Sequence, residues 1–137
     1  MKQAKLIVVI VFVMLAAVSG AHADEAQKRK LTVKCDAPAT NYSIKIQSVW
    51  RVGKELWVVS KIIEHGDGGG AAITPLKDSV EVDADKDLPV KHYISGKTWN
   101  WWTGVEAEFI KSRAALLEQM KEDKVEIGEV LYGDDPR

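Results

Sequence analysis

The clearest pattern along the chain is an alternation of apolar and polar positions over residues 42–52. One face carries Tyr42, Ile44, Ile46, Ser48, Trp50 and Val52, and a period of two is typical of a β-strand. Gly53-Lys54 suits a tight turn, and residues 55–64 are rich in β-branched side chains. The pattern predicts a long hairpin, with Trp50 and Trp57 in the core.

Shorter apolar stretches predict further strands. Residues 31–35 alternate, as do residues 89–95, and residues 125–132 add a last candidate strand. Residues 73–74 and 79–83 form two short candidates, which we expect Pro75 to separate.

A helical spacing replaces the strand pattern after the tryptophan-rich segment at residues 96–102. Thr103 and Glu106 match a capping box, which predicts a helix over about residues 103–122. The apolar stripe of this helix comprises Val105, Phe109, Leu116, Leu117 and Met120. The predicted fold class is mainly β (β-rich α+β), an antiparallel sheet or small immunoglobulin-like sandwich with one C-terminal helix.

The first residues carry a targeting pattern. Lys2 and Lys5 precede an unbroken apolar run at 6–18, and Ala21-His22-Ala23 matches a cleavage site. The run is shorter than the roughly 18 to 20 residues that span a bilayer. We therefore expect a signal peptide at residues 1–23, a single domain at residues 24–137 in the periplasm or outside the cell, and no integral membrane segment after cleavage.

Charge and cysteine content narrow the classes of function. The formal net charge is −1, from 19 basic and 20 acidic residues. Removal of Lys2 and Lys5 would leave 17 basic residues and a charge of −3, which argues against a nucleic-acid partner. Cys35 has no second cysteine to pair with in the chain, so it is buried, paired with another chain, or a reactive thiol. Burial is typical of a lone cysteine, and we predict it here.

No residue pattern indicates catalysis or metal binding. His65, His92, Cys35 and Asp67 lack the spacing of a metal site. The acids at positions 83, 85 and 87 lack the glycine and terminal glutamate of a calcium loop. We expect no cofactor, no metal and no enzymatic activity.

Two loops are the candidate contact surfaces. Trp99, Trp101 and Trp102 place three indoles within four residues, and they either close the end of the sheet or provide exposed anchors for a partner. Residues 66–70 are glycine-rich, with Gly68 and Gly69 at the centre, and lack the lysine of a phosphate-binding loop. This loop forms either a plain hairpin tip or a flat contact. Asn41-Tyr42-Ser43 also matches an N-glycosylation sequon.

Three loops in order resemble those of chagasin-type cysteine protease inhibitors. Residues 37–42 keep the proline, one threonine and the tyrosine of that family's first loop, residues 66–69 match its glycine-rich loop, and residues 97–99 keep a basic residue and the tryptophan of its third. The resemblance implies an immunoglobulin-like sandwich that inserts these loops into the cleft of papain-like proteases. On this resemblance Thr40 would approach the catalytic pair, Gly68-Gly69 would lie along the cleft, and Trp99 would pack on its rim. The first-loop asparagine and glycine and the third-loop proline are missing or changed, and a helix is predicted where that family continues in strand.

These features favour an exported, non-catalytic module that binds a protein partner. Its predicted binding residues are Trp99, Trp101, Trp102, Gly68, Gly69 and Thr40. One alternative is a chagasin-like inhibitor of papain-type proteases. Another is a small-molecule carrier or enzyme with a pocket between sheet and helix.

Overall fold

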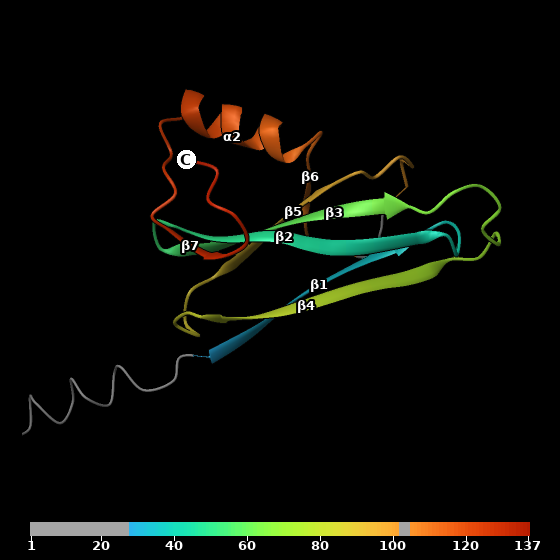
Figure 1. Ribbon diagram of the computed structural model, residues 1–137, viewed down its shortest axis with the longest axis horizontal. Coiled ribbons are helices and arrows are strands. Elements are labelled where there is room, and N and C mark those ends of the chain that lie inside the picture. The colour runs from blue at the N-terminus through green and yellow to red at the C-terminus, as the bar shows by residue number, and fades with distance from the viewer. Residues whose placement is uncertain (1–27, 102–104) are drawn as a thin grey trace, which may run out of the picture.

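The computed structural model describes residues 28–101 and 105–137, which form three layers (Figure 1). A two-stranded sheet pairs β1 (Lys28–Ala37) with β4 (Thr74–Asp83). It packs on one face of a five-stranded sheet, whose other face is covered by α2 (Arg113–Glu122). The predicted fold class, mainly β with one C-terminal helix, is confirmed.

The five-stranded sheet has the order β6-β5-β3-β2-β7. Its centre is the predicted hairpin of β2 (Tyr42–Val52) and β3 (Glu55–Glu64), which turns at Gly53 with φ of 59°. The remaining strands are β5 (Val90–Ser95), β6 (Glu108–Phe109) and β7 (Glu129–Tyr132). β5 lies parallel to β3, and β6 lies parallel to β5. This parallel pairing differs from the antiparallel arrangement expected, and it arises because the chain passes through β4 in the other sheet before it returns as β5.

Two apolar cores lie on opposite faces of the five-stranded sheet. The first fills the space between the two sheets and contains Cys35, which is 1% exposed; the predicted burial of this thiol is confirmed. The second lies beneath α2 and contains Trp50 and Trp57, as predicted. Leu116 and Met120 are the buried side chains that α2 contributes.

A β-bulge in β2 divides the strand between the two cores. The pairing register with β3 shifts between Ile46 and Ser48. Ile44 and Ile46 therefore face the β1–β4 sheet, whereas Trp50 and Val52 face α2. The prediction that all these residues share one face was wrong, because the extra residue of a bulge reverses every side chain after it.

The helix is shorter than the sequence predicted. It begins at Arg113, after Ser112, whose Oγ accepts a hydrogen bond from the N–H of Ala115 (3.0 Å). Thr103 lies outside the described residues, but residues 105–112 form a loop and β6 rather than helix. The predicted start was wrong because this segment pairs with the edge of β5. Phe109 pairs with Ile94, and the Ile110 N–H donates to the Ile94 carbonyl.

Pro75 lies inside β4 and does not separate two strands. β4 has only β1 as a strand neighbour among the described residues, and an edge strand tolerates a residue without an N–H. No helix in the described segments is long and apolar enough to cross a bilayer. The predicted signal peptide, residues 1–23, lies outside the described residues.

Candidate functional site

Three loops meet at one end of the sandwich, on the right in Figure 1. They are residues 38–41 between β1 and β2, residues 65–73 between β3 and β4, and residues 96–101 after β5. We call this surface the loop end. It brings together loops that are far apart in the sequence, and the first two are joined by direct hydrogen bonds.

Thr40 is joined to the glycine-rich loop in both directions. Its N–H donates to the carbonyl of Gly70 (3.0 Å), and its Oγ1 accepts from the N–H of Gly70 (2.7 Å). The neighbouring Asn41 extends this link, because its Nδ2 donates to the carbonyl of Gly66 (2.8 Å) and its carbonyl accepts from the N–H of His65 (2.7 Å). Four hydrogen bonds therefore hold the first loop against the second.

The close approach of the two loops explains one glycine in particular. A Cβ placed on Gly69 would lie 2.2 to 2.6 Å from the side-chain atoms of Asn41. Gly66 and Gly68 have φ of 68° and 97°, a region that favours glycine, but a Cβ on either would meet open space. The glycine-rich segment therefore does two things: it turns the chain, and it packs closely against Asn41.

An aromatic stack forms the third part of the loop end. The ring of Tyr42 meets the edge of Trp99 at 5.3 Å between centroids, and Trp99 lies 5.9 Å from Trp101. Trp99 is half-buried against the core between the sheets, whereas Trp101 is 37% exposed. Each of the two roles considered for the tryptophans therefore applies to one ring. Trp99 closes the end of the sandwich, and Trp101 presents its surface to solvent.

Lys97 holds this stack to the strand that follows it. Its Nζ lies 5.7 Å from the ring centroid of Trp99 and 5.1 Å from that of Phe109, within cation–π range. The same ammonium group donates a hydrogen bond to the carbonyl of Trp99. The contacts link the loop at residues 96–101 to β6, so that Phe109, itself 37% exposed, extends the aromatic surface.

The structure gathers most of the predicted site residues at the loop end. Trp102 lies outside the described residues; those that meet there are Thr40, Gly68, Gly69, Trp99 and Trp101. Sequence reasoning missed Asn41, Tyr42 and Lys97 as site residues. It recognised Asn41 only as part of a glycosylation sequon, and Tyr42 and Lys97 only as residues matched in the resemblance to chagasin-type inhibitors.

The histidines and the cysteine do not come together. His65 shares a hydrogen bond with Ser43 (2.6 Å) at the loop end. His92 lies on β5 beside a hollow that Thr32 and Glu106 also line, while Cys35 is in the core, where its Sγ contacts the Asp36 carbonyl at 3.7 Å. Among the described residues no group of three or more metal-ligating side chains is found.

The burial of His92 predicts that mild acid lowers the stability of the fold. Burial lowers its pKa below the usual 6.5, so the unfolded chain binds this proton more readily than the folded chain, and stability should fall as the pH drops below about 6.5. We expect urea denaturation at pH 7.5 and 5.5 to show a smaller pH-dependent loss for His92→Gln than for the native sequence. Equal losses would show that other groups account for the dependence.

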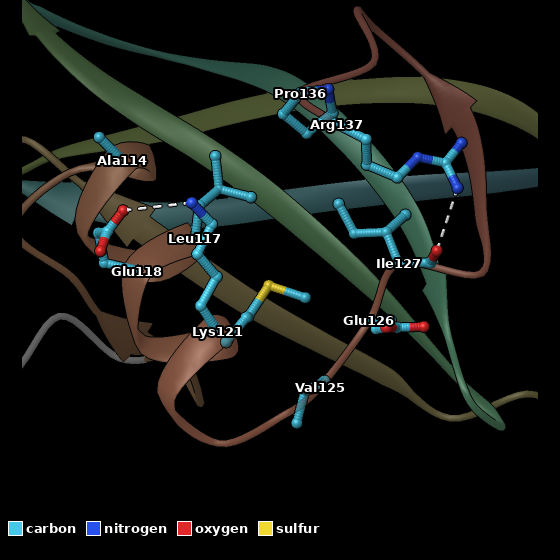
Figure 2. A pocket seen from close by; sticks show the side chains of 10 residues that line it. Ala114, Leu117, Glu118, Lys121, Val125, Glu126, Ile127, Pro136 and Arg137 are labelled. Carbon is cyan, nitrogen blue, oxygen red and sulfur yellow. Dashed lines mark hydrogen bonds and ion pairs between the residues drawn. The ribbon is translucent and has the colours of Figure 1, made fainter.

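A second hollow, of about 540 Å³, lies between α2 and the C-terminal segment (Figure 2). Leu117 lines it on the helix side and Ile127 on the opposite side, with Arg137 above. Arg137 donates to the Ile127 carbonyl (3.2 Å) and pairs with Asp135 (2.7 Å). The volume of this hollow is in the range of small-molecule sites. The hollow lies between α2 and the C-terminal segment, whereas the pocket expected from the sequence lies between sheet and helix.

The dependence of the loop end on Gly69 can be tested with a matched pair. Gly69→Ala should displace Asn41 and break its hydrogen bond to Gly66, costing about 1 kcal/mol of stability. Gly70→Ala meets Thr40 only at 3.4 Å and should be close to neutral. Amide hydrogen exchange of residues 65–73, measured with urea unfolding, should rise in the first variant alone. Equal behaviour of the two would contradict this account of the loops.

No model of a protein family matches the chain, and no curated protein or solved structure is significantly similar to it.

Proposed function

We propose that this protein is an exported, non-catalytic module that binds a protein partner through the loop end. The observation that carries the proposal is that three loops form one preformed surface: hydrogen bonds of Thr40 and Asn41 join the first loop to the glycine-rich loop. The ring contact between Tyr42 and Trp99 joins the third loop to the start of β2. A surface that is ordered before binding loses less conformational entropy on association. A loop end that is already ordered therefore favours a partner whose surface fits this one shape.

The exposed apolar groups of the loop end supply the contact area. Trp101 is 37% exposed and Ile73, at the end of the glycine-rich loop, is 71% exposed. Tryptophan is enriched among the residues that dominate binding energies, because it combines a large apolar ring with an N–H donor. Gly66 and Gly68 are exposed beside these anchors and leave their backbone open to a partner.

Site-specific photo-crosslinking tests the proposal directly. A benzophenone amino acid at position 73 should capture a partner from the exported fraction of the source cells. The same group at position 54, on the exposed β2–β3 turn at the other end of β2, should capture nothing specific. A partner captured equally from both positions, or only from position 54, would refute the loop end as the binding surface.

A narrower candidate is inhibition of papain-type cysteine proteases. It is favoured by one observation, that the loops carrying the resemblance to chagasin-type inhibitors lie side by side, with Thr40 bonded to Gly70 and Tyr42 packed on Trp99. Enzyme assays with papain and high micromolar protein test this candidate. Unchanged activity would eliminate it and leave the binding module in place.

The third candidate is a small-molecule carrier that uses the hollow between α2 and the C-terminal segment (Figure 2). Leu117, Met120 and Ile127 give this hollow an apolar wall, and the lining also contains four charged residues, Glu118, Lys121, Glu126 and Arg137. Filling it with Leu117→Trp should abolish ligand uptake in a screen of apolar dyes. If uptake persisted in this variant, the carrier would lose its support.

A further inference from the structure

A separate hollow of about 520 Å³ lies where β7 ends beside the bulge of β2. The chain leaves β7 through Gly133, whose φ is 85° and whose Cβ position lies 2.3 Å from the Gln47 carbonyl. This turn directs the C-terminal segment toward the start of α2. The residues lining the hollow are Lys45, Ile46, Gln47, Arg113, Tyr132, Gly133 and Asp134.

The charges around this hollow are mainly positive. Lys45 and Arg113 line it, and Asp134 is its one acidic residue. Lys45 is exposed and makes no ion pair within the described part of the chain. Lys61 lies directly opposite Lys45 in the register of β2 and β3, and like charges at such a position repel each other. An anion bound here would relieve that repulsion.

Arg113 already holds a carboxylate in this hollow. Its two terminal nitrogens donate to the two carboxylate oxygens of Asp134 (2.9 and 3.2 Å), and Nη1 also donates to Ser48 Oγ (2.9 Å). This paired geometry is the one by which arginine recognises carboxylates. The Arg113 side chain is 27% exposed and that of Asp134 is 69% exposed, and exposed ion pairs exchange at little cost. A second carboxylate can therefore compete with Asp134.

We propose that this hollow binds a small aromatic carboxylate, with Asp134 as an internal occupant that the ligand displaces. Arg113 takes the ligand carboxylate, Lys45 adds attraction, and the 37% exposed ring of Tyr132 provides an apolar wall for the aromatic group. The hydrogen bond from Arg113 holds the pKa of Asp134 below its usual range, so the internal carboxylate is charged at neutral pH and competes throughout. The site is separate from the loop end and does not depend on the function proposed for it.

Titration with benzoate at low salt, followed by NMR shifts of the backbone amides, tests this site. Asp134→Asn removes the internal competitor and should tighten benzoate binding by about threefold, the change expected for an exposed ion pair. Lys45→Gln should weaken binding by a similar factor. Lys54→Gln, an exposed lysine on the β2–β3 turn, is the matched control and should change nothing.

Benzamide, which lacks the charge, should cause no shifts in residues 45–48 and 132–134. The proposal is overturned if Asp134→Asn fails to tighten benzoate binding, or if Lys54→Gln weakens it as much as Lys45→Gln. It is also overturned if benzamide shifts the same amides as strongly as benzoate. Arg113→Gln should abolish binding, and because Arg113 also joins α2 to β2, the lysine and aspartate variants decide the result if that variant unfolds.

Discussion

Replacing Trp101 with alanine should weaken binding of the partner by about 30-fold, which corresponds to about 2 kcal/mol, the size typical of an interface hot spot. Trp101 is the outer ring of the stack, and Trp99 beneath it still packs on the core between the sheets. The fold should therefore lose only about 1 kcal/mol of stability, the contribution typical of one aromatic pair. Titration calorimetry with the crosslinked partner, once identified, and urea unfolding measure the two effects separately.

Tyr132→Ala is the matched control for Trp101→Ala. Tyr132 has the same exposure, 37%, but belongs to β7, away from the loop end. Partner affinity should be unchanged in this variant. If both variants weakened binding equally, or if Trp101→Ala had no effect, the contact surface would not be centred on the aromatic stack, and the proposed function would need another surface.

The parts of the fold that could be predicted are those in which local pattern and tertiary packing agree. β2 and β3 combine period-two alternation with a glycine turn, and the hairpin follows. Trp50 and Trp57 lie on that hairpin and are buried because the sheet is covered on both faces. The burial of Cys35 was predicted on a different ground, because a lone cysteine is typically packed in a core, and the side chain lies in the core between the two sheets.

The predictions that were wrong concern segments in which the local sequence pattern favours one structure and tertiary contacts stabilise another. A bulge between Ile46 and Ser48 leaves no mark in the sequence, yet it sends Trp50 to the opposite core from Ile46. Phe109 has helical spacing relative to Leu116, but it pairs with the edge of β5 and forms part of β6. Local propensity is a weak prior in such cases, because the sheet edge satisfies the same backbone groups by other means.

The positions of the loops that form the candidate site could be predicted from the sequence, but the contacts between those loops could not. Glycine and tryptophan content indicated where contact surfaces could lie. The link from Asn41 to Gly66 joins residues 25 positions apart, and Lys97 lies between two rings only after β6 has formed beside β5. Contacts of this kind depend on the fold as a whole, so a single sequence does not reveal them.

Gly96→Ala should be among the most destabilising single changes at the loop end, at about 3 kcal/mol. The φ of Gly96 is 87°, and a Cβ there would lie 2.3 Å from the carbonyl oxygen of Ile62. The left-handed conformation costs a non-glycine residue about 1 to 2 kcal/mol, and forcing an atom into a packed region costs about 1 to 3 kcal/mol more. Because Ile62 belongs to the central strand β3, the loop at residues 96–101 must move instead, and Trp99 with it.

Gly66→Ala separates the two contributions to that cost. Gly66 has a similar φ of 68°, but a Cβ there meets nothing within 4 Å, so this variant should lose only the conformational part, about 1 to 2 kcal/mol. Urea unfolding gives both free energies, and the tryptophan emission of the folded state should shift to the red in Gly96→Ala alone. A loss no larger than that of Gly66→Ala, with unchanged emission, would mean that the loop tolerates the extra methyl group. The close approach of Gly96 to β3 would then not be what holds Trp99 in place, and the order of the loop end would rest on Lys97 and on the Thr40–Gly70 hydrogen bonds.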